Sequence, residues 1–282
     1  MNYKIAIPSK GRPELLLKKT YEKIIDQYNL NYNDIYIFVS SKDDLKLYND
    51  TIPKNKYFKI ILGPKGLTET FNYIGEYFKE GQPILLLQDD VTAFYELSKD
   101  KKLVRVKNLK LIINRVFSAL YKTGLSLGGF YPVANETWMD KAKEVTTNLC
   151  FIFDPVRCFI NRKNVKLTLT FNGTRSTKQD IENSILNYIN DGGVLRFNKY
   201  SFETQYSPKK SNGGFGERTF DEELLVAKGI VEQYPLFADL KYSKKGQPNV
   251  RLVDKTLLKK NKNIIDRSVL PLKLVPEVTS DL

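Results

Sequence analysis

The sequence Ile84-Leu-Leu-Leu-Gln-Asp-Asp-Val91 is the most informative stretch of this 282-residue chain. Its aliphatic run is typical of a strand that is buried on both faces, and two adjacent carboxylates, Asp89 and Asp90, follow directly. Carboxylates at the carboxyl end of a buried strand can bind a hard divalent cation and leave coordination positions open for water and phosphate oxygens. Aspartates are also common in turns that only lead into the next element, and this simpler interpretation stays open.

Strand-like and helix-like segments alternate on both sides of this stretch. We expect strands where β-branched and aromatic residues are concentrated, at 3–7, 35–39, 58–62, 84–87, 125–130 and 149–153. Apolar residues with a period of 3.6 predict amphipathic helices between them, around 17–28, 71–78 and 109–120. This alternation predicts an α/β fold, Rossmann-like, with a mostly parallel sheet and helices on both faces, and with ligands bound beyond the carboxyl ends of the strands.

The second half of the chain contains two further predicted helices. Ser176 can cap the first of them, with Gln179 completing a capping box and isoleucines 181, 185 and 189 forming its buried stripe. Asp191-Gly-Gly193 then ends it. Strands are expected at 194–197 and 201–205, and a second helix at 219–234. We expect one domain over residues 1–238 and a basic C-terminal extension, packed on the domain or trailing it, over residues 239–282.

The charge balance points to an anionic partner. The chain has 45 Lys and Arg residues against 32 Asp and Glu residues and no histidine, for a net charge of +13. Such a surplus favours nucleic acid, a nucleotide, a phosphorylated sugar or a lipid surface as partner. The lack of histidine excludes imidazole-dependent zinc sites and histidine-dependent triads, so proton transfer must use Asp, Glu, Lys, Tyr or Cys.

Cysteine usage and hydropathy indicate where the protein works. Cys150 and Cys158 lie in apolar stretches, where a small buried side chain is the expected role. The N-terminus turns polar too early for a signal peptide, and the most apolar run is far shorter than the ~20 residues that span a bilayer. We therefore expect a cytoplasmic protein with no membrane partner.

Two strand-to-helix loops could bind a nucleotide. In Ile5-Ala-Ile-Pro-Ser-Lys-Gly-Arg-Pro13, the hydroxyl and the two cationic side chains stand beside a helix N-terminus, where a base, ribose or phosphate could be held. Leu62-Gly-Pro-Lys-Gly-Leu-Thr68 has the same form, and its Lys65 can reach a phosphate. Neither loop has the spacing of a P-loop or of a dinucleotide fingerprint, and either could be only a tight turn.

A candidate general base lies in Lys178-Gln-Asp-Ile-Glu-Asn183. Asp180 precedes the predicted apolar stripe and could face a cleft, and a chain without histidine would use such a carboxylate to remove a proton from an acceptor hydroxyl. The helix dipole lowers the basicity of a carboxylate in this position, and stabilising the helix is the alternative role. Glu182 is the second candidate base.

Taken in order, these motifs resemble a glycosyltransferase of the GT-A fold, and more narrowly the TET/JBP-associated glycosyltransferases, relatives of the enzyme that makes base J. No single motif is specific for this family, but the order of the motifs is. The resemblance covers the chain from roughly Lys4 to Arg251. The resemblance rests on Ile-Pro-Ser-Lys-Gly-Arg-Pro, the Gly-Pro-Lys-Gly-Leu loop, Asp-Asp, Gln-Asp-x-Glu-Asn-Ser, Asp-Gly-Gly and the Asn212-Gly-Gly214 loop.

The resemblance implies transfer of a sugar, glucose from UDP-glucose, to the hydroxymethyl group of a modified pyrimidine in DNA, with inversion, in a phage or viral setting within the host cytoplasm. It implies Asp180 as the base and Mn²⁺ or Mg²⁺ held by Asp90 together with Asp89. Gln88 departs from the family's Asp-x-Asp triplet, and the histidine metal ligand of many GT-A enzymes is absent. The donor residues that it implies are Pro8, Ser9, Lys10, Arg12, Lys65, Asn72 and Asp89, and the acceptor residues are Asn212, Gly213, Gly214 and Arg218.

Other classes of function share part of this pattern. A transferase acting on a small molecule, a glycan or a protein would have the same donor residues, and the excess of positive charge favours DNA as the acceptor. A nucleotidyltransferase would need a signature such as Gly-x-Gly-Thr near the first strand, which is missing. A DNA-binding relative without catalysis would also account for the charge, and hydrolysis of a nucleotide sugar would distinguish it from an enzyme.

Overall fold

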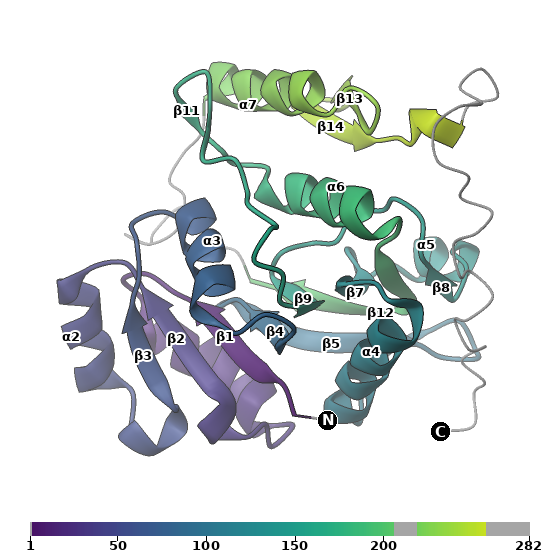
Figure 1. The fold of residues 1–282 in the computed structure, drawn as a ribbon. Helices are drawn as coiled ribbons and strands as arrows, with labels where there is room; N and C mark the ends of the chain where they lie inside the picture. Colours follow the sequence, from purple (N-terminus) through teal and green to yellow (C-terminus); the bar gives the residue numbers. More distant parts are fainter. Residues whose placement is uncertain (1, 206–218, 258–282) are drawn as a thin grey trace.

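A ten-stranded sheet forms the centre of the computed structural model, which describes residues 2–205 and 219–257 (Figure 1). Its strand order is β3-β2-β1-β4-β9-β7-β12-β5-β6, with β8 paired to β12. The strands are β1 (Lys4–Pro8), β2 (Ile35–Val39), β3 (Lys59–Leu62), β4 (Pro83–Leu87), β5 (Val91–Leu97), β6 (Leu103–Arg105), β7 (Leu127–Tyr131), β8 (Val145–Thr146), β9 (Val156–Ile160) and β12 (Leu195–Thr204).

Most strands of this sheet run in one direction. The block β3-β2-β1-β4 is parallel throughout, and β7, β12 and β6 share its direction. Strands β9, β5 and β8 run the opposite way. The expected α/β fold with a mostly parallel sheet is therefore confirmed, and the carboxyl ends of β1, β2 and β4 meet at one edge.

Helices cover both faces of the sheet. On one face lie α1 (Pro13–Leu16), which continues as the π-helix η1 (Leu17–Asp26), with α2 (Lys42–Thr51) and α4 (Leu109–Thr123). Their apolar residues pack against Ile5, Ile37 and Leu85. On the other face, Phe71 and Ile74 of α3 (Leu67–Tyr77) pack against the alternate strand residues, among them Ala6 and Leu86. The alternation places β1, β2 and β4 between two apolar layers.

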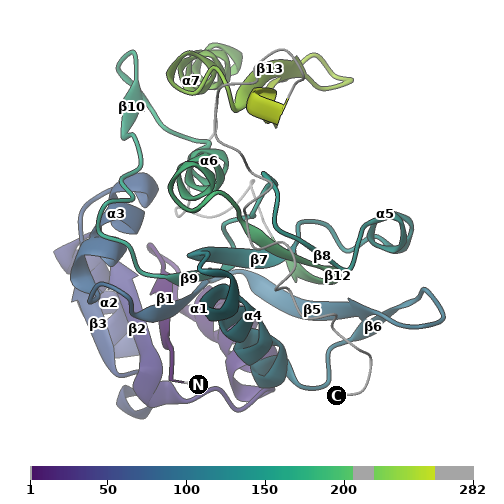
Figure 2. The ribbon, with the colours of Figure 1, turned by 45° about the vertical axis from the view of Figure 1, so that its right-hand side comes forward.

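A further layer lies outside the second face (Figures 1 and 2). Helix α6 (Gln179–Asp191) packs on the sheet through Tyr188 and against α7 (Phe220–Gln233) through Ile181 and Ile185. The hairpin of β13 (Ala238–Tyr242) and β14 (Pro248–Leu252) packs on α7. The short hairpin of β10 (Thr170–Phe171) and β11 (Thr174–Arg175) precedes α6.

The remaining elements are short. They are α5 (Glu136–Lys141) and the 3₁₀ turns η2 (Tyr32–Asp34), η3 (Lys54–Lys56) and η4 (Lys255–Leu257). The structure describes the predicted extension from residue 239 to 257, where it forms most of the β13–β14 hairpin, and the boundary at 238 stays a prediction. No helix in the described ranges is long and apolar enough to cross a membrane.

Four local predictions were wrong. Residues 149–153 form no strand. The side chain of Ile152 packs on Gly129 of β7, and its amide donates to Ser184 Oγ of α6 at 3.1 Å, so this amide is bonded to the helix and not to a neighbouring strand. The capping box at Ser176 does not form, because α6 begins later, with Lys178 as N-cap and no side-chain cap. Ile189 is 43% exposed, and the two strands expected at 194–205 are one, β12.

Candidate active site

A cavity of about 270 Å³ opens at the carboxyl ends of β1 and β4, beside the N-terminus of α3. The sequence predicted half of its lining, because loops that follow neighbouring parallel strands meet at one edge of the sheet. The predicted residues that line it are Pro8, Ser9, Lys10, Arg12, Lys65, Asp89 and Asp90. Residues that the motifs did not assign to the site complete the lining: Phe38, Ser40, Gly66, Leu67, Thr70, Gln88 and Arg175.

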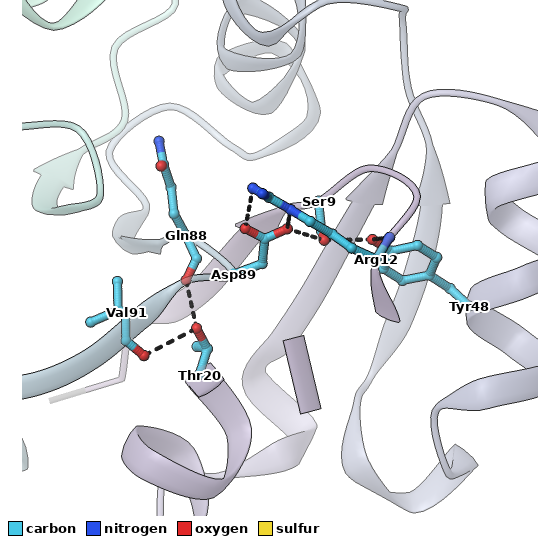
Figure 3. Close-up of polar contacts among 7 residues, drawn as sticks. All are labelled: Ser9, Arg12, Thr20, Tyr48, Gln88, Asp89 and Val91. Atoms are coloured by element: carbon cyan, nitrogen blue, oxygen red, sulfur yellow. Dashed lines mark hydrogen bonds and ion pairs between the residues drawn. The ribbon is translucent and has the colours of Figure 1, made fainter. Parts of the chain in front are cut away.

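Asp89 is held by a network of hydrogen bonds at the floor of the cavity (Figure 3). Arg12 donates to it from Nε, at 2.8 Å to Oδ2, and from Nη2, at 2.7 Å to Oδ1. Ser9 Oγ also donates to Asp89, so the hydroxyl of Tyr48 supplies the hydrogen between itself and Ser9 Oγ, 2.5 Å away. With its oxygens engaged in this way, Asp89 fixes the loop after β1 to the end of β4.

Asp90 is in the opposite situation. Its side chain is buried, and Oδ1 has no hydrogen-bond partner among the described residues. Burial, together with the neighbouring charge of Asp89, raises its pKa to about 6, while Arg12 opposes the shift. A buried carboxylate oxygen without a partner is costly, and a cation bound from the cavity would offset that cost.

The main chain on both sides of this carboxylate pair is anchored. Thr20 Oγ1 of η1 donates to the carbonyl oxygens of Gln88, at 2.8 Å, and Val91, at 3.4 Å (Figure 3). The amide of Gln88 donates to the carbonyl of Pro155 at 2.9 Å. The two aspartates are therefore held at fixed positions between η1 and the start of β9, as a preorganised site requires.

Cationic side chains surround the cavity. Lys10 and Lys65 are exposed, and Arg175 reaches in from the β10–β11 hairpin, where its Nη2 lies 3.6 Å from Oε1 of Glu69 in the first turn of α3. Gly66 precedes this helix with a φ of +124°, and the Glu69 carboxylate occupies the space that a Cβ at this position would take. Because Arg12 and Asp89 neutralise each other, the rim leaves an excess of positive charge that suits a diphosphate.

Two predicted residues lie elsewhere. Asn72 does not line the cavity: its amide group donates to the carbonyl of Leu167 at 2.9 Å and accepts from the amide of the same residue at 2.8 Å. Both oxygens of Glu182 are occupied, by the amide of Thr168 at 3.0 Å and by the hydroxyl of Tyr234 at 2.9 Å. Glu182 is fully buried and joins α6 to its neighbours, so it is not placed to accept a proton from a substrate.

Asp180 lies in the first turn of α6 and outside the lining of the cavity. The segment that precedes α6 contacts α3, where the hydroxyl of Thr68 donates to the carbonyl of Ser176 at 3.4 Å. Burial and the charge of Asp154 raise the pKa of Asp180 to about 7, against the lowering effect of the Ile181 amide and of Lys178. A carboxylate with a pKa near 7 suits general base catalysis at neutral pH.

The predicted acceptor residues Asn212, Gly213, Gly214 and Arg218 lie outside the described residues. Sequence reasoning missed Arg175 and Asp154, for which the chain offers no local motif. Within the described residues no group of three His, Cys, Asp or Glu side chains is arranged to hold a metal ion. A cation at Asp90 would therefore need ligands from the substrate and from water in addition to the protein.

No family model and no curated protein matches the sequence. Solved structures do match in fold. The crystal structure of S. aureus TarS aligns with 82% of this chain, at 10% identity and a TM-score of 0.50, and the chain covers 40% of that protein. The fold is of the GT-A type. S. aureus TarS 1–349 in complex with UDP-GlcNAc is 11% identical, with a TM-score of 0.48, and the alignment covers 82% of this chain and 67% of that one. The galactosyltransferase LgtC with donor and acceptor sugar analogues is 13% identical, with a TM-score of 0.38, and the alignment covers 68% of this chain and 72% of that one.

Proposed function

We propose that this chain is a glycosyltransferase that binds a nucleotide sugar in the cavity at the ends of β1 and β4. The observation that carries the proposal is the pairing of a buried, unpartnered Asp90 oxygen with a cationic rim of Lys10, Lys65 and Arg175 in one cavity. An anionic diphosphate together with a divalent cation would satisfy both. TarS, a neighbour in fold, is crystallised with UDP-GlcNAc and with UDP, which is in line with a uridine diphosphate donor.

Asp90 fits a Mn²⁺ or Mg²⁺ ion, with one protein ligand at Oδ1 and the remaining positions left to phosphate oxygens and water. Such an ion, when bound, neutralises the charge that develops on the diphosphate leaving group. Asp89 acts indirectly here, because its oxygens are engaged by Arg12 and Ser9 and it orients the loop that contacts the donor. Lys10 and Arg175 contribute fixed positive charge to the same leaving group.

Asp180 is the proposed base. It takes the proton of the acceptor hydroxyl as the oxygen forms a bond to the anomeric carbon and the bond from that carbon to the diphosphate breaks. Direct displacement of this kind inverts the anomeric centre. The products are the glycoside, the nucleoside diphosphate and a proton on Asp180.

The proposed acceptor is DNA that carries a hydroxymethylated pyrimidine, as the resemblance to the TET/JBP-associated glycosyltransferases implies, with glucose as the sugar. The net charge of +13 supports a polyanionic acceptor. Part of that charge lies on the β13–β14 hairpin, where Lys241, Lys244 and Lys245 are exposed. The cytoplasmic location and the division of the chain at residue 238 remain predictions alongside this proposal.

The test incubates the full chain with Mn²⁺, a panel of nucleotide sugars and DNA containing hydroxymethyluracil or hydroxymethylcytosine, followed by digestion to nucleosides and mass spectrometry. A hexose added to one modified nucleoside, and not to DNA with ordinary pyrimidines, is the expected result. Release of UDP from UDP-glucose without a DNA product would indicate that the acceptor is a small molecule, a glycan or a protein and not DNA. Neither binding nor hydrolysis of any nucleotide sugar would overturn the proposal in favour of a DNA-binding protein.

A further inference from the structure

A buried polar cluster beside Asp180 belongs to neither the donor cavity nor any predicted motif. Its centre is Asp154, in the segment between the 149–153 loop and β9, a residue that is only 2% exposed. Arg157, which is 5% exposed and stacks on Phe71 at 4.5 Å, donates to one Asp154 oxygen. The other oxygen, Oδ2, has no partner among the described residues.

The fold places this carboxylate against the first turn of α6. Ser184 Oγ donates to the carbonyl of Asp180 at 2.8 Å and accepts from the amide of Ile152 at 3.1 Å, so the segment that leads to Asp154 runs along this turn. The side chain of Gln179, next to Asp180, acts to lower the pKa of Asp154. The Pro155 carbonyl meanwhile accepts from the Gln88 amide at 2.9 Å, which ties the same segment to the strand that carries Asp89 and Asp90.

Other buried oxygens near this turn also lack partners. Ser176 is fully buried and Gln179 is 6% exposed, yet Ser176 Oγ and Gln179 Oε1 have no hydrogen-bond partner among the described residues. Unsatisfied buried polar atoms are rare in folded proteins, and a catalytic role is one of the reasons for which they are kept. The first turn of α6 also has no side-chain cap for its backbone amide groups.

We propose that Asp154 is a positioning residue for the transfer reaction, which places a second negative charge beside Asp180 and so makes Asp180 an effective proton acceptor. The inference rests on the proposed function. Asp154 is clamped by Arg157 and does not itself need to touch the substrate. A carboxylate beside a like charge in a buried setting holds its proton more tightly, which raises its strength as a base.

The charged groups around Asp180 support this assignment. After burial, the charge of Asp154 contributes most to the raised pKa of Asp180, and Lys178 acts in the opposite direction. Lys178 Nζ is itself engaged with Glu223 of α7 at 2.5 Å, so part of its positive charge is compensated. Arg157 is paired with Asp154, and burial still raises the pKa of Asp154. The arrangement leaves a net like-charge interaction between the two aspartates.

The test uses the full chain, labelled with ¹³C at the aspartate carboxyl carbons, and follows the Asp180 signal by NMR as the pH changes, with Asp180→Asn to assign the signal. Asp154→Asn keeps the size of the side chain and removes its charge, so we expect the midpoint for Asp180 to fall by about one pH unit. Asp191→Asn is the matched control, because it removes a buried carboxylate at the opposite end of the same helix. An unchanged midpoint in Asp154→Asn would overturn the inference.

A second measurement needs no variant at position 154. In the wild-type protein, coupled groups report each other's titration, so the Asp154 signal should show a step at the midpoint of Asp180. A single step at another pH would contradict the coupling. Calorimetry with UDP-glucose and Mn²⁺ is run in parallel: lack of donor binding would refute the proposed function, whereas the titration would still decide whether the two aspartates interact.

Discussion

Arg12 and Asp89 form a two-pronged ion pair that joins the loop after β1 to the end of β4. The Asp89 side chain is 1% exposed and that of Arg12 is 19% exposed, so the pair is shielded from water on the carboxylate side. Such a pair is strong when both partners are present, because geometry and charge are matched at both contacts. Removal of either partner is destabilising, because the charge of the other stays buried without compensation.

Arg12→Gln is therefore expected to lower the free energy of unfolding by about 3–5 kcal/mol, because it leaves the Asp89 carboxylate buried without its cation. Urea denaturation at pH 7 measures the change. Lys46→Gln is the control: it breaks the fully exposed Lys46–Asp50 pair on α2 and should leave the midpoint unchanged. A loss for Arg12→Gln no larger than that of the control would mean that the pair contributes little to the fold.

Asp90→Asn is expected to stabilise the protein without metal. The pKa of Asp90 is raised from 3.8 to about 6, so the native state binds this proton more tightly than the unfolded chain, and stability falls as the pH rises through this interval. The variant should gain roughly 2–3 kcal/mol at pH 7 in the presence of a chelator, and the difference from wild type should shrink as the pH falls to about 4. Urea titrations at a series of pH values measure it. A variant less stable than wild type at pH 7 would contradict the proposed state of this carboxylate.

Asp90→Ala tests the proposed metal role. Transfer should be lost and nucleotide-sugar binding weakened, because the diphosphate charge can no longer be neutralised by an ion held at this carboxylate. Mn²⁺ together with UDP should raise the melting temperature of the wild type and not that of the variant, since a ligand stabilises only a native state that binds it. Asp100→Ala, in an exposed turn after β5, is the control. Turnover by the wild type that survives chelation would refute the metal role.

The β13–β14 hairpin contributes Lys241, Lys244 and Lys245 to the basic region between Lys241 and Lys262. If it contacts DNA phosphates, the logarithm of the binding constant should fall with the logarithm of salt concentration with a slope of several units. Lys244→Gln and Lys245→Gln should each reduce that slope by about one. Lys54→Gln, an exposed lysine after α2, should leave it unchanged. A slope near zero, or no retention on DNA at low salt, would favour an acceptor other than DNA.

The sequence predicted the donor side of the site well, for a physical reason. Residues at the ends of β1 and β4 are close because parallel neighbours bring their carboxyl ends together, so Ser9 and Asp89 meet although they are 80 positions apart. Strand β9 was missed: its second residue, Arg157, is buried through its contacts with Asp154 and Phe71, and a charged residue hides the apolar pattern of the strand.

Contacts made across layers could not be predicted from local pattern. Arg175 reaches the donor cavity because a two-residue strand turns the chain back between α3 and α7, and no periodicity marks such a hairpin. The side chain of Asn72 forms two hydrogen bonds with the main chain of Leu167. This pairing depends on the packing of two segments that are distant in sequence. The spacing of its apolar residues predicts helix α3, but it does not predict the hydrogen-bond partners of the polar residues on that helix.

Asp180 carries the last prediction. A hydroxymethyl hydroxyl is a poor nucleophile until its proton is removed, and a positioned base contributes about 10²–10⁴-fold to the rate. Asp180→Asn keeps the size of the side chain and the start of α6 but cannot take that proton, so transfer should slow by about this factor while donor and metal affinity stay close to wild type.

The pH dependence separates a base from a helix-stabilising carboxylate. Because the pKa of Asp180 is raised to about 7 and the ionised form accepts the proton, the wild-type rate should rise through pH 7 and level off above it, and this rise should be absent from the residual rate of Asp180→Asn. Glu182→Gln is the comparison: it weakens contacts between α6 and its neighbours and should lower stability without moving the rise. Loss of donor binding in Asp180→Asn would place this residue in the donor site, and a near-normal rate would leave it the role of stabilising the helix.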